Sequence, residues 1–355
     1  MKLKKWVTNA LRWLNILLII GTILSYTAAF VSPQSFWVLS LFGLAYPVFL
    51  VLNVIFFFIF VSLKSRTAIL SLACILLGWN YLSVMYATNS SKISASDNKI
   101  TVCSFNIESL YTYRNNAKSQ NQYEYEDETS FAPYRSFFDQ ASANIICLQE
   151  YFPKNSYFNK YFQKNTPFSI KGSLSIYSKY PIINQGEAIA GGKKTNGAIF
   201  ADLKIDTTIV RVYNVHLQST GIAPEAQKIA DENKIKVENT KSSIRKIVSG
   251  LKSASQLRAK QVDEVVKHIQ GCPYPVIICG DFNDTPYSYS YQQVRGNLKD
   301  SFLERGNGFG VTYNGPIPTL RIDYILGSPS LNFLSHKIIN SKVSDHYPII
   351  SEISF

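Results

Sequence analysis

Charged residues are missing from a long stretch near the start of this sequence. The chain has 355 residues, 17% of them charged, and no Asp, Glu, Lys or Arg occurs over the 51 residues between Arg12 and Lys64. Residues 1–90 contain no acidic residue, six basic ones and all four tryptophans. A soluble domain needs charged groups to hydrate its surface, and a disordered chain contains few apolar residues. The composition therefore excludes a purely soluble protein and a disordered one.

Cysteine is also scarce, and its spacing carries no metal or redox motif. The five cysteines are Cys74, Cys103, Cys147, Cys272 and Cys279. They form no C-x-x-C pair, and three of them fall inside apolar runs that resemble strands. This pattern excludes a disulfide-rich miniprotein and a zinc site of the usual spacing, and it predicts buried free thiols.

Three long apolar segments occupy the uncharged region. Leu14–Val31, Phe36–Leu63 and Thr67–Ala87 each contain roughly the 20 residues that cross a bilayer core. They predict three transmembrane helices, at about 14–31, 36–63 and 67–87, in a membrane anchor of residues 1–87 that contacts lipid. The spans hold no ionisable residue of the kind that marks a transport path. They are therefore expected to act as an anchor only, and a transporter is disfavoured.

The basic residues of this region predict its orientation. They precede the first segment or lie in the loop at 64–66, and basic residues favour the cytoplasmic side. We therefore expect a multi-pass membrane protein with a cytoplasmic N-terminus and an extracytoplasmic chain after about residue 88. One alternative is that the first segment, which ends near Ala28-Ala29, is a cleaved signal peptide, which would reverse the orientation.

A polar stretch at 88–99 separates this anchor from residues 100–355 and is expected to be a linker. Short apolar runs bounded by Gly, Pro, Asn or Asp recur after it, and this pattern is typical of strands. Helical patterns intervene at Tyr134–Ala143, Glu225–Val248 and Ser255–Gln270. This alternation predicts an α/β domain of two stacked sheets flanked by helices. The expected strands are Ile100–Phe105, Ile145–Leu148, Leu174–Tyr177, Ala198–Ile205, Ile209–Val215, Val276–Cys279, Ile322–Leu326 and Ile349–Ile353.

Acidic, amide and imidazole side chains stand at the ends of these strands. They include Asn106, Glu150, Asp281 and Asp345, whose oxygens suit Mg²⁺ or Mn²⁺ better than zinc. His216 and His346 are half of the chain's four histidines. Each residue alone is compatible with a structural role in a turn or in the core. Together, two imidazoles beside carboxylates that can bind a metal predict a phosphoryl-transfer centre.

Seven short motifs in one order resemble the endonuclease/exonuclease/phosphatase superfamily, whose fold is that of DNase I and exonuclease III. The resemblance covers residues 100–355 and implies a four-layered α/β sandwich. The motifs are Ser104-Phe105-Asn106, Leu148-Gln149-Glu150, Gly172 followed by Ile176–Ile182, Asn214-Val215-His216-Leu217, Gly280-Asp281-Phe282-Asn283, Arg321-Ile322-Asp323-Tyr324 and Ser344-Asp345-His346.

The resemblance also implies a role for each candidate residue. Asn106 and Glu150 would bind the divalent cation, Mg²⁺ or Mn²⁺, with Asp345 close to the same site. The catalytic group would comprise His216, Asp281, Asn283, Asp323 and His346. In it, Asp281 would orient or deprotonate the attacking water, and Asn283 would donate a hydrogen bond to the scissile phosphate. Asp323 would align His346, and His216 would be the counterpart of His346 on the other side of the site. The sequence leaves open whether Asp281 or His346 is the base, and whether one metal ion or two take part.

The expected function is that of a membrane-anchored, metal-dependent phosphoesterase acting on phosphodiester or phosphomonoester bonds. Nucleic acid is the first expected substrate, a sphingomyelin- or phosphoinositide-type lipid headgroup is the alternative, and a non-catalytic tethered binding domain is a further one. No protein partner is expected. Two segments outside the motifs, 111–130 and 221–260, are expected to be insertions. The second carries nine basic and four acidic residues, and it fits either a solvated helical cover or a basic lip of the substrate site.

Overall fold

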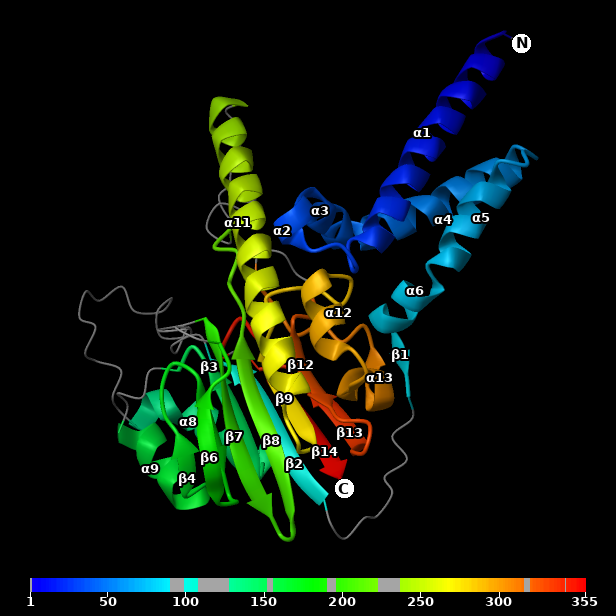
Figure 1. Ribbon diagram of the computed structural model, residues 1–355. Coiled ribbons are helices and arrows are strands. Elements are labelled where there is room, and N and C mark those ends of the chain that lie inside the picture. The colour runs from blue at the N-terminus through cyan, green and yellow to red at the C-terminus, as the bar shows by residue number, and fades with distance from the viewer. Residues whose placement is uncertain are drawn as a thin grey trace.

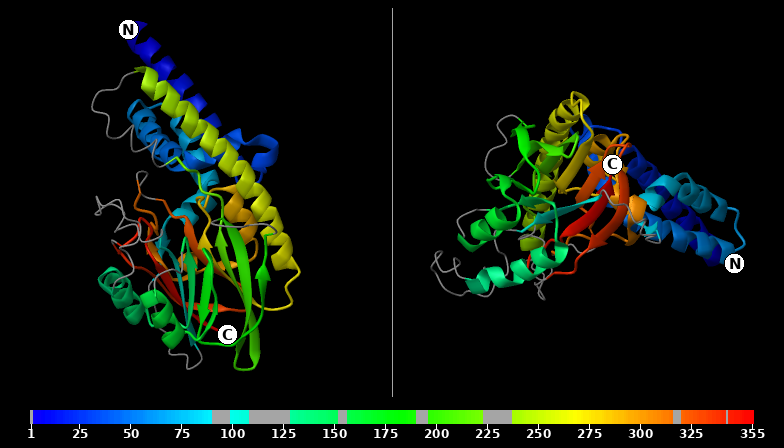
Figure 2. Two further views of the ribbon diagram at one scale, coloured as in Figure 1. Left: turned by 90° about the vertical axis from the view of Figure 1, so that its left-hand side faces the viewer. Right: turned by 90° about the horizontal axis from the view of Figure 1, so that it is seen from below.

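The computed structural model describes residues 2–89, 99–107, 128–151, 156–189, 196–222, 237–315, 320–341 and 343–355. An N-terminal group of apolar helices stands against one end of an α/β unit (Figure 1). In the two further views this unit consists of two layers of strands with helices on their outer sides (Figure 2). The expected insertion at 111–130 lies almost wholly outside the described residues.

The N-terminal region contains six helices. They are α1 (Lys2–Thr27), α2 (Pro33–Phe36), α3 (Val38–Leu44), α4 (Tyr46–Ser62), α5 (Ala68–Leu77) and α6 (Trp79–Met85). One helix, over Trp6–Thr27, is long and apolar enough to cross a membrane. The helices α3 and α4 reach that length only together and meet at 59°, and α5 and α6 likewise meet at 60°. Of the three transmembrane helices that were predicted, the structure therefore shows one clear helix of membrane length, and the second and third segments are bent helix pairs.

Both breaks have a local cause. Pro47 stands in the first turn of α4, and it has no N–H group to continue the hydrogen bonding of α3. Gly78 separates α5 from α6, and a Cβ atom there would lie only 2.1 Å from the Tyr26 hydroxyl of α1. The Tyr26 hydroxyl in turn donates to the Cys74 carbonyl of α5 at 2.9 Å. The second segment therefore bends at a proline, and the third bends where α1 packs against it.

Two mixed six-stranded sheets form the rest of the fold, which confirms the prediction of an α/β unit with two mixed sheets flanked by helices. In each sheet the two central strands are parallel, β2 with β3 and β8 with β9, and the other pairs are antiparallel. The first sheet has the order β13 (Asn332–Ile338), β14 (Ile349–Ser354), β2 (Lys99–Asn106), β3 (Ile145–Gln149), β5 (Ser175–Ser178) and β4 (Phe168–Ile170). The second has the order β10 (Lys299–Asp300), β12 (Asp323–Gly327), β9 (Val276–Asp281), β8 (Thr208–His216), β7 (Gly197–Ile205) and β6 (Ile182–Glu187).

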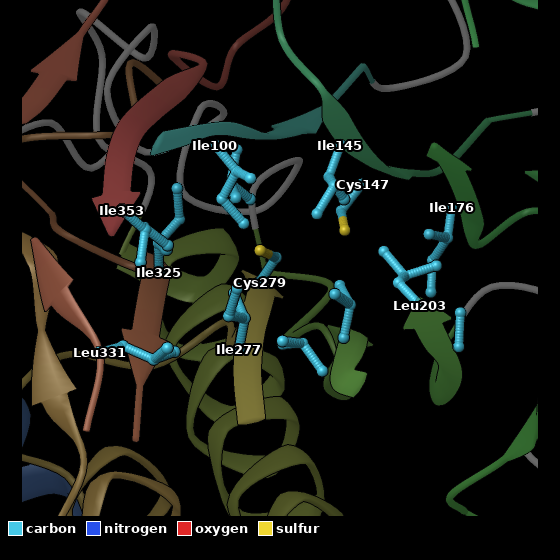
Figure 3. Packing of buried hydrophobic residues seen from close by; sticks show 14 of the residues in the cluster. Ile100, Ile145, Cys147, Ile176, Leu203, Ile277, Cys279, Ile325, Leu331 and Ile353 are labelled. Atoms are coloured by element: carbon cyan, nitrogen blue, oxygen red, sulfur yellow. The ribbon is translucent and has the colours of Figure 1, made fainter. Parts of the chain in front are cut away.

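The main core lies between the two sheets and is built largely from branched aliphatic side chains. Figure 3 shows Ile145 and Ile353 of the first sheet facing Ile277 and Ile325 of the second. The outer face of the first sheet packs against aromatic residues of α8 (Glu128–Ala141) and α9 (Ser156–Asn165). The outer face of the second packs against α11 (Val237–Gln270) and α12 (Tyr289–Arg295). Each sheet therefore buries both faces, as the apolar runs of its strands predict.

All eight expected strands are present, but one helix prediction is wrong. The helices expected at 225–248 and 255–270 are a single helix, α11, which continues through Gly250 from residue 237 onward. A Cβ atom at Gly250 would approach the Ile222 side chain at 3.0 Å and the Thr220 carbonyl at 3.1 Å. The glycine therefore allows close packing instead of ending the helix. Residues 223–236 lie outside the described part of the chain.

The N-terminal helices are docked on the α/β unit. Tyr46 and Val84 pack with Tyr287, whose ring centroid lies 4.8 Å from that of Tyr46. Arg321 donates to the Val84 carbonyl at 3.1 Å, and Gln34 of α2 donates to the Asp263 carboxylate of α11 at 3.1 Å. The linker predicted at 88–99 is partly structured, because β1 (Ala87–Thr88) pairs with β11 (Asn307–Gly308). Its residues 90–98 lie outside the described ranges.

Candidate active site

The eight candidate residues meet at one edge of the two sheets. The parallel strands β2 and β3 end at Asn106 and just before Glu150, and the parallel strands β8 and β9 end at His216 and Asp281. The carboxyl ends of parallel strands lie at the same edge. In the second sheet Asp281 pairs in register with His216 on one side and with Asp323 on the other. The fold alone therefore brings these side chains together.

Asp281 is the centre of this group. Its Oδ2 atom accepts hydrogen bonds from the side-chain amides of Asn106 at 3.1 Å and of Asn283 at 3.2 Å. The same oxygen lies 3.6 Å from Nε2 of His216 and 3.7 Å from Nε2 of His346. The side chain of Asp281 is 1% exposed. A buried carboxylate in contact with two amides and two imidazoles is held in a single position.

Two unusual backbone positions shape the loop that carries Asp281. Gly280 has φ 145°, and a Cβ atom there would lie 1.8 Å from the Val215 carbonyl oxygen of the neighbouring strand. Asn283 has φ 51°, a conformation that asparagine tolerates better than most residues. Its backbone N–H donates to Oδ1 of Asp281 at 2.7 Å. The sequence Gly-Asp-Phe-Asn therefore folds into a tight turn that presents the aspartate.

His346 and Asp323 form a second buried pair. Nδ1 of His346 lies 3.0 Å from Oδ2 of Asp323, and the Asp323 backbone N–H donates to the Thr312 hydroxyl. Burial raises the pKa of Asp323 to about 6. Burial alone would lower the pKa of His346, but the carboxylates of Asp323, Asp281 and Asp345 raise it well above its usual value. The imidazole is therefore oriented by Asp323, and its Nε2 atom points toward Asp281.

Glu150 and Asp345 complete the acidic part of the site. Oε1 of Glu150 lies 3.5 Å from Nε2 of His216, and Oδ1 of Asp345 lies 3.9 Å from Nε2 of His346. Both side chains line a cavity of about 230 Å³, together with Asp281 and His346. The site thus joins all eight candidate residues through contacts of less than 4 Å.

The donors in this site fit a hard divalent cation. The carboxylates of Glu150, Asp281 and Asp345 face one cavity, and oxygen ligands suit Mg²⁺ or Mn²⁺. Within the described part of the chain, potential ligand atoms of Asp281, Asp323 and His346 also lie within 4.8 Å of one another. Asp323 is already engaged by His346, so the carboxylates that line the cavity are the better donors. Asn106 reaches the site through the hydrogen bond that its side-chain amide donates to Asp281.

Several residues near the site were not singled out from the sequence. Gln149 donates to Asn214 at 2.7 Å across the two sheets, and Asn214 donates to the carbonyls of Leu148 and Ser175. These bonds fix the strand ends that carry Glu150 and His216. The sequence signal that could have identified Gln149 and Asn214 is a polar side chain within an otherwise apolar strand. Tyr313, whose ring lies 5.1 Å from that of His346, had no sequence signal at all.

The largest departure from expectation is the apolar part of the cavity lining. Ser40, Leu41 and Leu44 of α3 belong to this lining, beside Ile222 and Leu251 from the segment 221–260. Arg258, a basic residue of that segment, also lines the cavity, but its guanidinium bonds to Asp284 at 3.1 Å. The N-terminal region was expected to act only as an anchor without its own chemistry, and in the structure three residues of α3 also line the cavity.

Two family models match the chain. One, described as endonuclease/exonuclease/phosphatase family, matches residues 103–346, which is more than half of the chain. The other, described as a domain of unknown function (DUF8431), matches residues 8–85. No curated protein matches the sequence.

Solved structures similar to this chain include three with different descriptions. TDP2 of D. rerio, complexed with a single-strand DNA product, is 16% identical with a TM-score of 0.49, covering 73% of this chain and 100% of that one. The human Nocturnin catalytic domain is 16% identical with a TM-score of 0.49, covering 72% and 94%. A mannosyl-6-phosphatase of Bacteroides thetaiotaomicron is 17% identical with a TM-score of 0.46, covering 72% and 100%.

Proposed function

The chain belongs to the endonuclease/exonuclease/phosphatase family, and on this premise we propose that it is a membrane-anchored, divalent-metal-dependent hydrolase of phosphate esters. The observation that carries the proposal is the buried carboxylate of Asp281, held by Asn106 and Asn283 beside two imidazoles. This arrangement suits the hydrolysis of a phosphodiester or a phosphomonoester. A non-catalytic binding domain would have no need for such a costly buried polar cluster.

The roles of the residues follow from their contacts. Asp281 faces the cavity and acts on the attacking water, as its orienting group and base. Asp323 holds His346 through Nδ1, so a proton on Nε2 is directed at the phosphate and offsets the charge that develops there. The side-chain amide of Asn283 donates to Asp281 and to the Leu217 carbonyl in this structure, and it would turn one of these N–H groups to the phosphate when substrate binds. His216 lies 3.6 Å from Asp281. Bound Mg²⁺ or Mn²⁺, held by Glu150 and Asp345 with Asn106, would supply positive charge at the phosphate oxygens.

The proposed catalytic group is tested by one isosteric substitution. Asp281→Asn keeps the shape of the side chain but removes its negative charge and its basicity. We expect the full chain in detergent to hydrolyse bis(p-nitrophenyl) phosphate, and the variant to lose about a thousandfold in kcat/KM. The matched control is Asp206→Asn in the β7–β8 turn, where φ is 51° and asparagine is tolerated. Equal activity in the two variants would show that Asp281 takes no part in the reaction.

The membrane part of the proposal includes the two bent helix pairs as broken spans beside α1. Asn15 of α1 donates to Ser71 of α5 at 2.7 Å, and Asn53 of α4 donates to Thr22 of α1 at 2.8 Å. Such bonds between buried polar groups hold helices together in lipid. They support α1 as a retained part of the bundle and disfavour a cleaved signal peptide.

The orientation is proposed from the position of the basic residues. Figure 1 places the N-terminus and the turn between α4 and α5 at the end of the bundle that is remote from the sheets. Lys64 and Arg66 lie in that turn, and Lys2, Lys4 and Lys5 lie near the N-terminus. Basic residues favour the cytoplasmic side, so we place this end in the cytoplasm and the catalytic unit outside.

A further inference from the structure

The substrate cavity has an apolar wall that comes from the N-terminal region. Leu41 and Leu44 of α3 face the same cavity as Asp281 and His346. The position of α3 is fixed by its neighbours, because Gln34 of α2 bonds to Asp263 of α11 and the Lys252 ammonium lies 5.5 Å from the Trp37 ring centroid. The wall is therefore part of the folded structure.

A second cavity of about 280 Å³ adjoins the first one. The two share Leu44, Thr285 and Leu320. The second lies between α6 and the α/β unit, and it is lined mainly by apolar side chains that include Met85 and Phe309. Leu44 is 37% exposed and Phe309 is 58% exposed. Large apolar side chains that are exposed to solvent beside a candidate reaction centre offer a binding surface for an apolar group.

The charges around both cavities disfavour a polyanion. Among the described residues that line them, the cationic side chains apart from His346 are two arginines, and both are engaged by acids. Arg258 bonds to Asp284 at 3.1 Å, and Arg321 bonds to the buried Asp300 at 2.7 Å. A nucleic-acid strand carries a phosphate at every nucleotide and is bound through unpaired cationic groups. A substrate with one phosphate and an apolar remainder fits these linings better.

The cavities also adjoin the apolar helices. Leu44 ends α3, and α4 begins two residues later with side chains such as Val48 and Val51 that are more than half exposed. An apolar surface therefore runs from the second cavity toward the bundle that we place in the membrane. A lipid chain can leave the cavity along this surface without entering water.

We propose that the two cavities bind one amphiphilic phosphate ester, with its phosphate at Asp281 and His346 and its apolar chain between Leu44 and Phe309. The helices 1–87 thus form part of the substrate site. In the reaction, the oxygen of water bonds to phosphorus and the ester P–O bond breaks. The alcohol leaves with one proton of that water, and the phosphate product keeps the hydroxyl. This inference rests on the proposed hydrolase activity and names its substrate class.

The test compares two diesters that differ only in chain length. Ethyl and dodecyl p-nitrophenyl phosphate release the same nitrophenolate, and both are given to the full chain with Mn²⁺ in one mixed-micelle preparation. The test variant is Leu44→Gln. Its control is Leu257→Gln, because Leu257 is an exposed leucine of α11 that lines neither cavity. We expect Leu44→Gln to lower kcat/KM for the dodecyl ester by about tenfold, the value of two buried methylene groups. The ratio of the dodecyl to the ethyl value should fall with it, and Leu257→Gln should leave both values unchanged.

Two outcomes separate this inference from the proposed function. If neither diester is hydrolysed, the proposed hydrolase activity itself fails. If Leu44→Gln hydrolyses both diesters as fast as the wild-type chain does, the apolar subsite is wrong. If Leu44→Gln lowers the hydrolysis of both esters, Phe309→Gln is tested next, because Phe309 lines only the second of the two cavities. This variant must then selectively lower the hydrolysis of the dodecyl ester. Cleavage of single-stranded DNA with a kcat/KM above that of the dodecyl ester would also overturn it.

Discussion

At the scale of single residues, Asp281 shows how a buried charge is given one position. Two amide donors and two imidazoles approach the same oxygen, and the backbone N–H of Asn283 satisfies the other. A carboxylate that is removed from water needs such partners to offset the hydration that it loses. The same contacts therefore stabilise the folded site and hold the Asp281 carboxylate in the position that the proposed reaction requires.

A partly buried histidine away from the site makes the stability of the fold depend on pH. Burial lowers the pKa of His336 from 6.5 to about 4, and its Nδ1 atom lies 2.9 Å from the Ser301 hydroxyl. Between these two values the unfolded chain binds a proton that the folded chain does not. The free energy of unfolding should therefore fall as the pH drops from 6.5 toward 4, by about 2 kcal/mol at pH 5.

Thermal unfolding of the full chain at pH 7 and pH 5 measures this effect. We expect the wild-type chain to lose more stability between these pH values than His336→Gln, which has no proton to bind. Each protein is compared with itself, so a general cost of the substitution cancels. An equal loss in both proteins would show that His336 does not titrate in this range.

At the scale of elements, the turn after β9 depends on a residue without a side chain. Gly280→Ala would place a Cβ atom 1.8 Å from the Val215 carbonyl at φ 145°. We expect a loss of more than about 3 kcal/mol of stability, or failure to fold. The control is Gly271→Ala after α11, where the nearest atom would lie at 3.8 Å. Thermal unfolding of both variants checks the difference, and similar melting temperatures would contradict it.

The elements also show what the sequence can and cannot predict. Strands buried on both faces, such as β3 and β9, appear as apolar runs. The strand β6 was missed because it lies at a sheet edge and contains Asn184 and Gln185, so it has no such run. The bend at Pro47 was hidden by the long apolar stretch around it. The site residues were recognisable because their motifs are local, at the ends of strands.

The apolar wall of the site could not be predicted in this way. Leu41 and Leu44 are ordinary apolar residues within a long apolar segment, and nothing in the local sequence distinguishes them. Their part in the cavity depends on how α2 and α3 dock on α11, and the contact between Gln34 and Asp263 that holds them joins residues 229 positions apart. Contacts at that separation leave no mark on spacing or composition.

At the scale of the whole molecule, the N-terminal helices and the α/β unit form one structure. Arg321, in the loop before β12, bonds to the end of α6 and to Asp300, and Asn89 donates to the Leu303 carbonyl at 2.7 Å. A docked unit has a fixed distance and direction from the apolar helices, unlike a domain on a flexible tether. The position of its cavity beside the apolar helices is therefore a constant feature of the molecule.

The proposed orientation gives a prediction at this scale. A reporter fused after Phe355 should lie outside the cytoplasm, since three crossings follow a cytoplasmic N-terminus. In a bacterial host we expect alkaline phosphatase at this position to be active and a green fluorescent protein to be dark. The reverse pattern would mean an even number of crossings, as removal of the first helix would produce.

The central claim is that this chain hydrolyses phosphate esters with a bound divalent cation, and one measurement tests it most directly. The full chain is assayed with bis(p-nitrophenyl) phosphate before and after treatment with EDTA, and again after Mg²⁺ or Mn²⁺ is restored. We expect hydrolysis that EDTA abolishes and that the added ion recovers, because Glu150 and Asp345 face the reaction cavity as oxygen ligands. Hydrolysis that continues at the same rate in EDTA, or that never occurs with either ion, would contradict the account.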